Sequence, residues 1–484
     1  MNRSATSRVD TVDLAVIGAG AAGLAAAIFA AERAAELGAA LRIVLLDGAA
    51  KVGAKILISG GGRCNVTHAG ASVDDFNGTP RPTVRNVLAA FDTDAAVRWF
   101  ASLGVALKAE PGGKLFPTTD RAATVLDALL GRAAARGVEI RTRSRVEAVR
   151  LAGGGNVAGD NSGERDNDID VRNDDEIDGH GNDIGFALTV GDDTILARRV
   201  ILATGGRSLP RTGSDGGGWA IAARLGHTVT PTFPALVPLV LDAAFWHAEL
   251  SGVSHPAELT TVADGKVVDR RAGSMLWTHF GISGPVVLDA SRHWLAARRV
   301  ATSVELRCSV FPDSDAGARP RASFHDAQGT DGWFVAVARR EGGRPVGAVL
   351  GDVLPDRLAR TLCRHAGVDA TTRLSEVTKG DRRALAAAIG ALPLPVVGDR
   401  GWDFAEVTAG GVPLSEIDHR TMGSRRAPGL HLVGEMLDVD GRIGGFNFQW
   451  AWATGYLAGR GAVASLVDGP ERATRLATGS VHDA

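Results

Sequence analysis

Cysteine is scarce in this chain. Its 484 residues include three, Cys64, Cys308 and Cys363, which lie far apart and lack the spacing of metal ligands. A zinc site or a disulfide framework therefore does not fit the sequence, and we expect no metal site. So few cysteines suit a reducing compartment, and we expect the protein to be cytoplasmic.

Long apolar runs are absent as well. No run reaches the roughly 18 apolar residues that a membrane span needs. The alanine-rich segment 24–37 is interrupted by Glu32, Arg33 and Glu36. The first twelve residues, MNRSATSRVDTV, lack the apolar core of a secretion signal. We therefore expect neither a membrane anchor nor a secretory leader.

The chain has no stripe of Lys and Arg interleaved with aromatic residues, so we do not expect nucleic acid as a partner. Its formal net charge is −2, but residues 153–185 hold ten acidic residues against two arginines, which leaves about +6 elsewhere. This acidic segment is rich in Gly and Asn and nearly free of large apolar residues. We expect it to be a disordered surface loop. A calcium site is the lesser alternative, because the run lacks the closing Glu and fixed Gly of a calcium loop.

Size and composition indicate a globular protein of more than one domain. At 484 residues with 45% hydrophobic content, the chain can build substantial cores. Segment 138–151 and segment 186–190 predict strands on either side of the acidic segment, and these would otherwise form a hairpin.

The strongest motif is DLAVIGAGAAG at residues 13–23, where an apolar strand runs into Gly18-x-Gly20-x-x-Gly23 and then into an alanine-rich helix. Gly18 permits the tight turn, Gly20 lets the backbone approach a pyrophosphate, and Gly23 lets the helix lie close to the strand. The helix N-terminus offers free N–H groups and a positive dipole end to phosphates. Tight packing alone would be the structural explanation of the same glycines. The context favours dinucleotide binding.

An acidic residue follows the next strand at the expected place. Residues 41–46 (LRIVLL) predict a buried strand, and Asp47 comes directly after it. The distance from Gly23 to Asp47 is close to the roughly 20 residues expected for a carboxylate that binds a ribose hydroxyl.

A glycine-rich segment, SGGGRCN at residues 59–65, can wrap its backbone closely around a cofactor. Arg63 offers a planar fork for a phosphate or carboxylate. We expect the neighbouring arginine and the N–H groups of the turn to lower the pKa of Cys64 and favour its thiolate. With no resolving partner in a CxxC pattern, packing is the alternative role of this cysteine.

Six motifs in order along nearly the whole chain resemble the BaiN-like family of bacterial flavoproteins, which are described as NAD(P)/FAD-dependent oxidoreductases and include aminoacetone oxidase-type members. The motifs are GAGAAG (18–23), KILISGGGRCNVTH (55–68), ATGGRSLPRTGSDGGG (203–218), THFGISGP (278–285), TAGGVPLSEID (408–418) and GEMLDVDGRIGGFNFQWAWATG (434–455). The chain departs from the family in its acidic segment and in Phe446 and Phe448, where Tyr and Leu are frequent.

The resemblance implies an α/β fold: a Rossmann-like FAD-binding domain of glutathione reductase type, interrupted by an inserted β-rich, barrel-like domain with a small helical part. We place the FAD-binding domain at residues 1–230 and 402–484 and the inserted domain at 231–401, with its helical segment at 346–390. In the insert, residues 237–241, 258–268, 273–278, 304–310 and 333–337 predict short strands.

Together with the glycine motifs, the resemblance places the cofactor contacts. A strand at 194–206 ends in Thr-Gly-Gly, and a helix from about residue 446 follows two glycines, so that its N-terminus can face the pyrimidine edge of a flavin. Asp438 and Glu435 are candidates for ribityl or phosphate-proximal hydroxyls, although a turn role is the alternative for Asp438. The expected cofactor-binding residues are Gly18, Gly20, Ala22, Gly23, Asp47, Lys55, Gly61, Gly62, Arg63, Cys64, Asn65, Thr204, Gly205, Gly206, Gly434, Glu435, Asp438, Gly444, Gly445, Phe446 and Asn447.

The implied activity is that of an FAD-dependent oxidoreductase that acts on a small organic substrate by hydride transfer at flavin N5. The candidate catalytic residues are Arg63, Cys64 and His279, the last as a proton carrier or a structural turn residue. Because no second strand-linked GxGxxG is found, NAD(P)H would visit the flavin only transiently. The alternatives are a tRNA-modifying flavoenzyme and a protein whose FAD is structural or regulatory. The sequence does not predict the oligomeric state.

Overall fold

The computed structural model describes residues 8–152, 185–311 and 327–467. The predicted acidic loop 153–185 lies outside these ranges except for its last residue. The chain forms two compact units: Met1–Thr232 with Thr408–Ala484, and Phe233–Val407. The domain limits expected after residues 230 and 401 remain a prediction, and so does the independent folding of the two domains.

The first unit is built on a mixed sheet whose central strands are parallel, in the order β22 (Leu430–Leu432), β10 (Asp193–Leu202), β1 (Val9–Ile17), β2 (Ile43–Leu46) and β7 (Glu139–Arg141). β2 is buried along its whole length, and so is the C-terminal half of β1. That burial on both faces is typical of parallel sheets. The expected hairpin forms between β8 (Ala148–Leu151) and β9 (Phe186–Val190), while β7 pairs with β2 instead.

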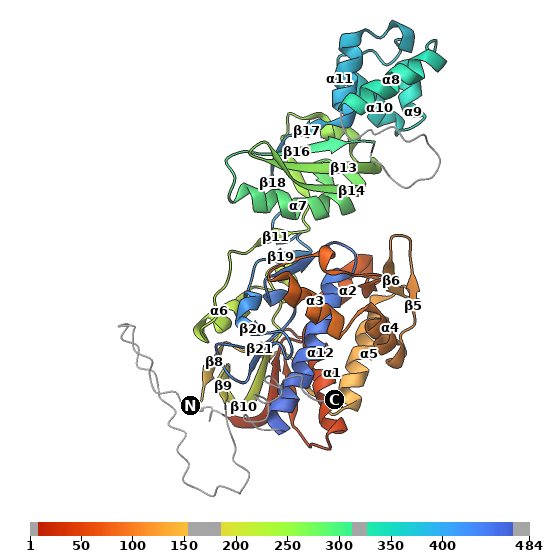
Figure 1. The fold of residues 1–484 in the computed structure, drawn as a ribbon. Helices are drawn as coiled ribbons and strands as arrows, with labels where there is room; N and C mark the ends of the chain where they lie inside the picture. Colours follow the sequence, from red (N-terminus) through yellow and green to blue (C-terminus); the bar gives the residue numbers. More distant parts are fainter. Residues whose placement is uncertain (1–7, 153–184, 312–326, 468–484) are drawn as a thin grey trace, which may run out of the picture. The chain divides into compact units, whose positions relative to one another are not determined.

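Two helices at opposite ends of the sequence pack against each other in this unit. α1 (Ala21–Glu36) and α12 (Phe446–Val467) run side by side in Figure 1. Small residues allow the close approach: a Cβ at Gly459 of α12 would come 2.3 Å from the carbonyl oxygen of Ala26 in α1. The alanine-rich sequence after the glycine turn therefore serves this helix–helix contact as well as the turn itself.

Shorter elements complete the first unit. Its other helices are α2 (Ala54–Gly62), α3 (Arg81–Ala90), α4 (Thr93–Ser102), α5 (Ala122–Ala135) and α6 (Gly217–Arg224). In one small sheet, β6 (Lys114–Pro117) lies between β3 (Thr67–His68) and β5 (Leu107–Ala109). In another, β23 (Val439–Gly441) pairs with β4 (Phe76–Gly78). Two short strands, β20 (Ile417–Asp418) and β21 (Gly423–Ser424), extend the main sheet beyond β22.

The second unit has its own hydrophobic core and a seven-stranded sheet. The strand order is β17 (Leu392–Leu394), β16 (Val304–Ser309), β13 (Ser254–Ala263), β14 (Lys266–Thr278), β15 (Gly281–Ser283), β12 (Leu239–Leu241) and β18 (Val396–Asp399). α7 (Pro285–Arg298) packs on strands β13 and β14. The short strands β11 (Phe233–Ala235) and β19 (Val407–Ala409) lie where the chain enters and leaves this unit.

The helical part of the second unit consists of α8 (Ala327–Glu341), α9 (Val346–Gly351), α10 (Asp356–His365) and α11 (Lys379–Gly390). Pro355 caps the N-terminus of α10, so the helical segment expected at 346–390 is divided at this proline. The strand predicted at 333–337 is wrong. These residues lie in α8, where Thr330, Phe334 and Val337 are buried at helical spacing on one face.

None of the helices in the described ranges combines the length and apolarity needed to cross a membrane. Within the same ranges, no three His, Cys, Asp or Glu side chains are grouped so that they could hold a metal ion.

Candidate functional site

The three glycines of the first turn differ in what surrounds them. Gly18 has a φ of +102°, and a Cβ on it would lie 2.5 Å from the carbonyl oxygen of Ala203 in the neighbouring strand. A Cβ on Gly23 would overlap the carbonyl oxygen of Gly18, at 1.8 Å. A Cβ on Gly20 would meet no atom of the described residues within 4 Å. The turn is thus closed on the protein side and open in front of Gly20, at the N-terminus of α1.

Asp47 lies at the end of β2 and braces this turn. Its Oδ2 accepts a hydrogen bond from the backbone N–H of Ala19 at 2.7 Å, and its Oδ1 accepts one from the N–H of Ala49 at 2.8 Å. Each carboxylate oxygen keeps acceptor capacity beyond these bonds. The structure places Asp47 next to the glycine turn. Its role toward a ribose remains a prediction.

A polar network joins segments far apart in sequence. Lys55, at the start of α2, donates from Nζ to Glu435 Oε2 and to Ser208 Oγ, both at 2.7 Å. Ser208 Oγ and the backbone N–H of Thr408 donate to Glu435 Oε1, at 2.7 and 3.0 Å. Thr408 Oγ1 in turn accepts from the backbone N–H groups of Arg207 and Ser208.

This network was not foreseen from the sequence. Lys55 and Glu435, both expected to bind the cofactor, are paired with each other in the structure, and their contact with a cofactor remains a prediction. Ser208 and Thr408 belong to two of the family motifs, but nothing in their local sequence indicates a common partner 27 or more residues away. The network fixes the segment after Gly206, where a Cβ would come 2.5 Å from Thr408 Oγ1.

The neighbouring glycines carry the chain through conformations that other residues avoid. Gly205 and Gly434 have φ values of +74° and +71°. A Cβ on Gly434 would come 2.9 Å from the Cβ of Ala22 in α1. Thr204 lies next to Gly218, whose added Cβ would overlap its Oγ1. The ends of β10 and β22 therefore pass close to the glycine turn.

The end of α2 and the residues that follow it include four left-handed residues, so regular helical geometry stops before Gly60. Gly60, Gly61 and Gly62 have φ values of +56°, +69° and +84°, and Cys64 has +61°. Gly61 has open space in front of it, since a Cβ placed on it would meet nothing within 4 Å. Such a loop presents backbone rather than side chains.

Arg63 holds a protein carboxylate. Its Nη1 and Nη2 donate to the two carboxylate oxygens of Glu110 at 2.6 and 3.3 Å, and its guanidinium stacks on Phe116 at 4.0 Å from the ring centre. A second carboxylate, Asp120, lies 3.4 Å away. The fork that we expected to hold a phosphate or carboxylate is occupied by Glu110, and the catalytic and cofactor-binding roles of Arg63 remain predictions.

The lowered thiol pKa expected for Cys64 is wrong. The side chain is completely buried, and burial raises the pKa of the Cys64 thiol to about 12. Arg63 does not counteract this, because its charge is directed to Glu110. A buried, protonated thiol is a poor nucleophile. These facts favour the packing alternative for Cys64, while its cofactor contact remains a prediction.

The start of α12 combines two left-handed glycines with an aromatic stack. Gly444 and Gly445 have φ values of +132° and +96°. Phe446 is buried and stacks on the His68 imidazole, with 4.4 Å between ring centres. Asn447 bonds both backbone groups of Gly441, at 2.8 and 2.9 Å, so its carboxamide holds the turn that leads into the helix.

Asn65 lies against this helix start with an unused acceptor. This residue is 8% exposed, and its Oδ1 is buried without a hydrogen-bond partner among the described residues. A Cβ on Gly445 would come 2.9 Å from this oxygen. A buried acceptor without a donor costs about 1–3 kcal/mol, so native proteins rarely keep one unless a partner arrives.

Asp438 and His279 are placed differently. Asp438 is half-buried, and its Oδ2 accepts a hydrogen bond from Thr230 Oγ1 at 3.0 Å. His279 is exposed on the turn between β14 and β15, in the second unit, with its ring edge-on to Phe280. The expected turn is present. His279 belongs to the second unit, whereas the other candidate residues belong to the first, and its role in proton transfer remains a prediction.

A buried His–Glu pair was missed by the sequence reasoning. His227 Nδ1 lies 2.8 Å from Glu416 Oε2, and its Nε2 lies 2.7 Å from Ser424 Oγ. Ser424 Oγ also accepts from the backbone N–H groups of Arg426 and Ala427. The arrangement therefore links Ser424 of β21 to Glu416, which precedes β20, and to His227, which follows α6.

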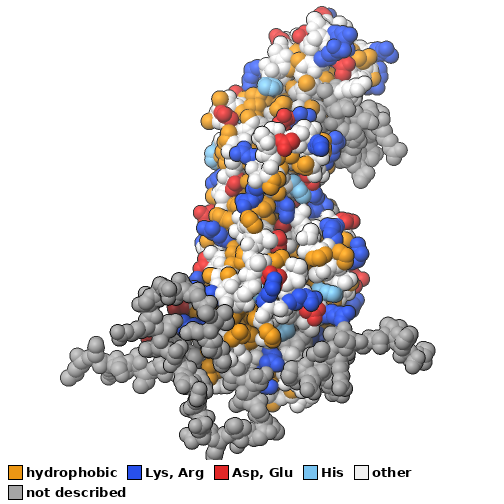
Figure 2. All heavy atoms as spheres, turned by 60° about the vertical axis from the view of Figure 1, so that its left-hand side comes forward, with side chains coloured by type: hydrophobic (Ala, Val, Ile, Leu, Met, Phe, Trp, Pro, Cys, Tyr) orange, Lys and Arg blue, Asp and Glu red, His pale blue; other side chains and the backbone are white. Residues whose placement is uncertain are grey.

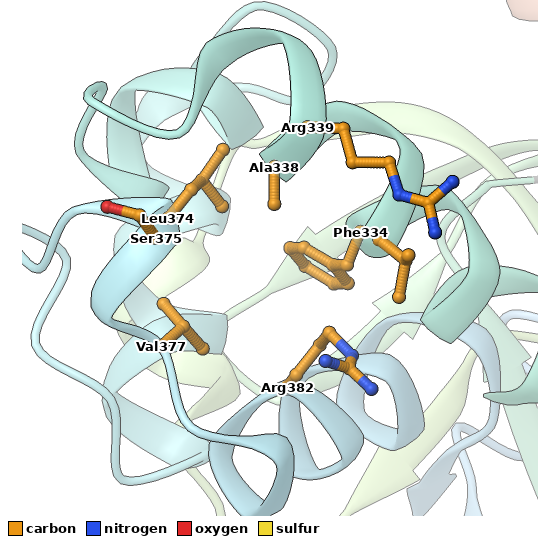
Figure 3. Close-up of a pocket in the computed structure, with 8 residues that line it drawn as sticks. Phe334, Ala338, Arg339, Leu374, Ser375, Val377 and Arg382 are labelled. Carbon is orange, nitrogen blue, oxygen red and sulfur yellow. The ribbon is translucent and has the colours of Figure 1, made fainter.

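The second unit carries a hollow of about 290 Å³ between its helices. Figure 3 shows Phe334 and Ala338 of α8 facing Leu374 and Val377. Two arginines, Arg339 and Arg382, also line the hollow. Arg382 donates to Asp331 at 2.7 Å, so its charge is partly used. The hollow is apolar at its floor, and none of the expected site residues line it.

The residues of the first unit fit a flavin adenine dinucleotide on three observations. The space in front of Gly20 is free at the N-terminus of a 16-residue helix. The N-terminus of the 22-residue α12 follows Gly444 and Gly445, both left-handed. Asn65 Oδ1 is buried beside it and lacks a donor. Two helix N-termini provide N–H groups and positive dipole ends for phosphates and for charge on a reduced flavin.

A Rossmann-type sheet with this glycine turn is a dinucleotide-binding fold, and together with the similarity to a reductase along 93% of the chain it identifies an FAD-dependent oxidoreductase. The chain belongs to the HI0933-like protein Rossmann domain family, which matches residues 12–166 and 161–461. The resemblance to BaiN-like flavoproteins and the expected α/β Rossmann-type fold are thereby confirmed.

Three known proteins illustrate the similarity. The chain is 32% identical to the 3-dehydro-bile acid delta(4,6)-reductase of Clostridium scindens, over 93% of this chain and 98% of that protein. It is 29% identical to the ribosomal RNA dihydrouridine synthase of Escherichia coli, over 94% and 99%. A solved flavocytochrome c3 fumarate reductase aligns over 95% of this chain and 79% of that one, with 16% identity and a TM-score of 0.44.

Proposed function

We propose that this protein reduces a C=C bond conjugated to a carbonyl group in a small organic substrate, with FAD as its cofactor and NAD(P)H as its electron donor. One observation carries the proposal. Both relatives described above have names that denote saturation of such a bond: the Δ4,6 double bonds of a 3-keto steroid in one, and the C5=C6 bond of uridine in the other. A shared reaction type is the simplest link between substrates so different in size and polarity.

The reaction adds a hydride to the carbon far from the carbonyl and a proton to the carbon next to it. FAD, bound in its reduced form, would supply the hydride from N5. The chain supplies binding: Gly20 leaves room for the pyrophosphate, and Asp47 keeps acceptor capacity for a ribose hydroxyl. The N-terminus of α12 favours negative charge on the pyrimidine side of the reduced flavin. His279 is the proposed proton carrier, since it is exposed and belongs to a family motif.

A second candidate substrate is uridine in RNA. It is favoured by the two relatives named ribosomal RNA dihydrouridine synthase, from Escherichia coli and Haemophilus influenzae, each 29% identical to this chain. Against it, the face shown in Figure 2 carries Lys, Arg, Asp and Glu side chains interspersed rather than a stripe of one sign. We therefore rank the small-molecule substrate first.

The test is a half-reaction without NAD(P)H. FAD-loaded protein is reduced with dithionite under anaerobic conditions and mixed with a conjugated steroid enone, the saturated ketone as control, or a uridine-containing RNA. The return of flavin absorbance at about 450 nm is then followed. Rapid reoxidation by the enone and none by the saturated ketone supports the proposal. Reoxidation by RNA alone assigns the second candidate. No reoxidation by either acceptor contradicts a C=C reductase and leaves the alternative of a structural or regulatory flavin.

The proton carrier is tested in the same assay. Replacing His279 by Gln keeps a polar side chain but removes the titratable ring, so we expect slower reoxidation by the enone with unchanged FAD binding. Gln at His365, a histidine of α10 in the same unit, is the matched control. Equal rates for both variants and the wild type would remove His279 from the mechanism.

A further inference from the structure

We propose that Asn65 recognises the imide edge of the flavin, with its Oδ1 accepting a hydrogen bond from flavin N3–H. The proposal rests on the proposed function insofar as that function includes FAD. It concerns a single atom pair, which neither the family nor the sequence motif assigns.

The proposal starts from the hydrogen-bonding chemistry of Asn65 Oδ1. Asn65 Oδ1 has no donor among the described residues, and the residue is only 8% exposed. An oxygen acceptor in such a place requires an N–H or O–H group from outside the chain. The candidates that FAD offers are N3–H on the flavin ring, the hydroxyls of its ribityl and ribose parts, and the adenine amino group.

Asn65 Oδ1 lies beside the N-terminus of α12. Oδ1 lies against Gly445, which precedes α12, and the first intrahelical bond there runs from the N–H of Gln449 to the carbonyl of Gly445. The N–H groups of the first helical turn have no acceptor within the helix and act as donors toward a ligand. An acceptor beside a set of donors is the complement of an imide, O=C–NH–C=O. The imide edge of the flavin has this pattern, whereas a hydroxyl group has no comparable flanking acceptors.

The backbone around Asn65 is held rigidly against the start of α12. Asn65 is followed by β3, and Thr67 Oγ1 donates to Gln449 Oε1 at 2.6 Å, which ties this strand to the first turn of α12. The adjacent Val66 carbonyl accepts from Trp452 Nε1 at 2.9 Å. Both contacts fix the backbone around Asn65 relative to the helix start, so the acceptor and the helical donors form one preset surface. Preorganised polar groups of this kind discriminate strongly between ligands that do and do not match them.

The test compares FAD with 3-methyl-FAD, in which a methyl group replaces the N3 hydrogen. The full-length protein is stripped of flavin, and the Kd of each flavin is measured by fluorescence titration. We expect the wild type to bind FAD at least about tenfold more tightly than 3-methyl-FAD. Asn65→Leu, which has nearly the same shape but no acceptor, is expected to weaken FAD binding and to lose this preference. Asn86→Leu, at an exposed asparagine on α3, is the control and keeps the preference.

Each other outcome is informative. Equal affinity of the wild type for both flavins overturns the proposal, and so does a preference that survives in Asn65→Leu. Asn65→Asp, which retains an acceptor oxygen, is expected to keep the preference and provides the test if the leucine variant fails to fold. Failure of the wild type to bind either flavin is a different result. It contradicts the proposed function itself rather than the role of Asn65.

Discussion

At the scale of single residues, alanine substitutions at two glycines of one turn, Gly20 and Gly23, should have opposite effects on FAD binding and on stability. Gly20→Ala places a methyl group in open space at a φ of −80°, which alanine adopts without strain. We expect the flavin-free protein to keep its stability within about 0.5 kcal/mol, while FAD binding weakens at least tenfold because the methyl group fills the cofactor's space. The measurements are urea unfolding of the flavin-free protein and the FAD Kd.

Gly23→Ala is the matched comparison, because its methyl group would overlap the carbonyl oxygen of Gly18. We expect it to lower the free energy of unfolding by several kcal/mol, through the strain of separating α1 from the turn. If Gly20→Ala binds FAD as tightly as the wild type, the open space in front of this residue is not the pyrophosphate site.

His431 predicts a pH dependence of stability. Burial, with a smaller contribution from the Arg199 charge, lowers the pKa of His431 to about 4, although the bond to the Thr421 carbonyl and the Asp418 charge oppose the shift. Above about pH 6.5 the ring is neutral in the folded and unfolded chain alike. As the pH falls from 6.5 toward 4, the unfolded chain binds a proton that the folded one excludes. Stability therefore decreases by up to about 1.4 kcal/mol per pH unit from this group.

His431→Gln keeps an amide donor for the Thr421 carbonyl but cannot titrate. Urea unfolding between pH 7 and pH 4.5 should show a shallower loss of stability in this variant than in the wild type. Identical slopes would mean that the buried imidazole accepts its proton in the folded state.

At the scale of elements, Glu435 joins α2, the segment after β10 and the start of β19. Glu435→Ala leaves Lys55 Nζ, the buried Ser208 hydroxyl and the Thr408 N–H without this acceptor. We expect a loss of about 2 kcal/mol, because the pair is partly exposed and the charges are screened. Glu435→Gln retains an oxygen acceptor and is expected to lose about half as much. Urea unfolding measures both, and equal losses would show that the charge rather than the bonds matters.

The elements also show what the sequence could and could not predict. The turn at Gly18, the strand before it and α1 after it were predictable because one local motif specifies all three. Residues 333–337 were misassigned to a strand because Trp, Phe and Val are frequent in strands. Their burial at spacings of four and three residues, from Thr330 to Phe334 and Val337, needed the tertiary structure to be recognised.

Partners of charged side chains were the least predictable feature of the site. Arg63 and Cys64 are adjacent in sequence, and the expected lowering of the thiol pKa assumed that their side chains interact. In the structure Arg63 is directed to Glu110, 47 residues away, while Cys64 is buried. Similarly, Lys55 and Glu435 are 380 residues apart. Pairings across such distances depend on the topology of the whole unit, which local sequence does not reveal.

At the scale of the whole molecule, the chain has two separate hydrophobic cores, one in each compact unit. We predict two unfolding transitions in calorimetry. At a hundredfold excess over its Kd, FAD should increase the free energy of unfolding of the first unit, which contains the proposed cofactor residues, by about 2.7 kcal/mol. Only the transition temperature of this unit should therefore rise. Limited proteolysis at intermediate temperature assigns each transition. A single transition that shifts as a whole with FAD would show that the two units unfold as one.

Above all, we expect this chain to bind FAD and to pass electrons through it to a substrate. The most direct test is to load the purified protein with FAD, mix it anaerobically with NADH and then with NADPH, and follow the flavin band at about 450 nm. We predict a bound flavin that is bleached rapidly by one of the two nucleotides and recovers when a conjugated enone is added. A protein that cannot be loaded with FAD, or a bound flavin that stays oxidised with both nucleotides, would contradict FAD-dependent electron transfer from NAD(P)H by this chain.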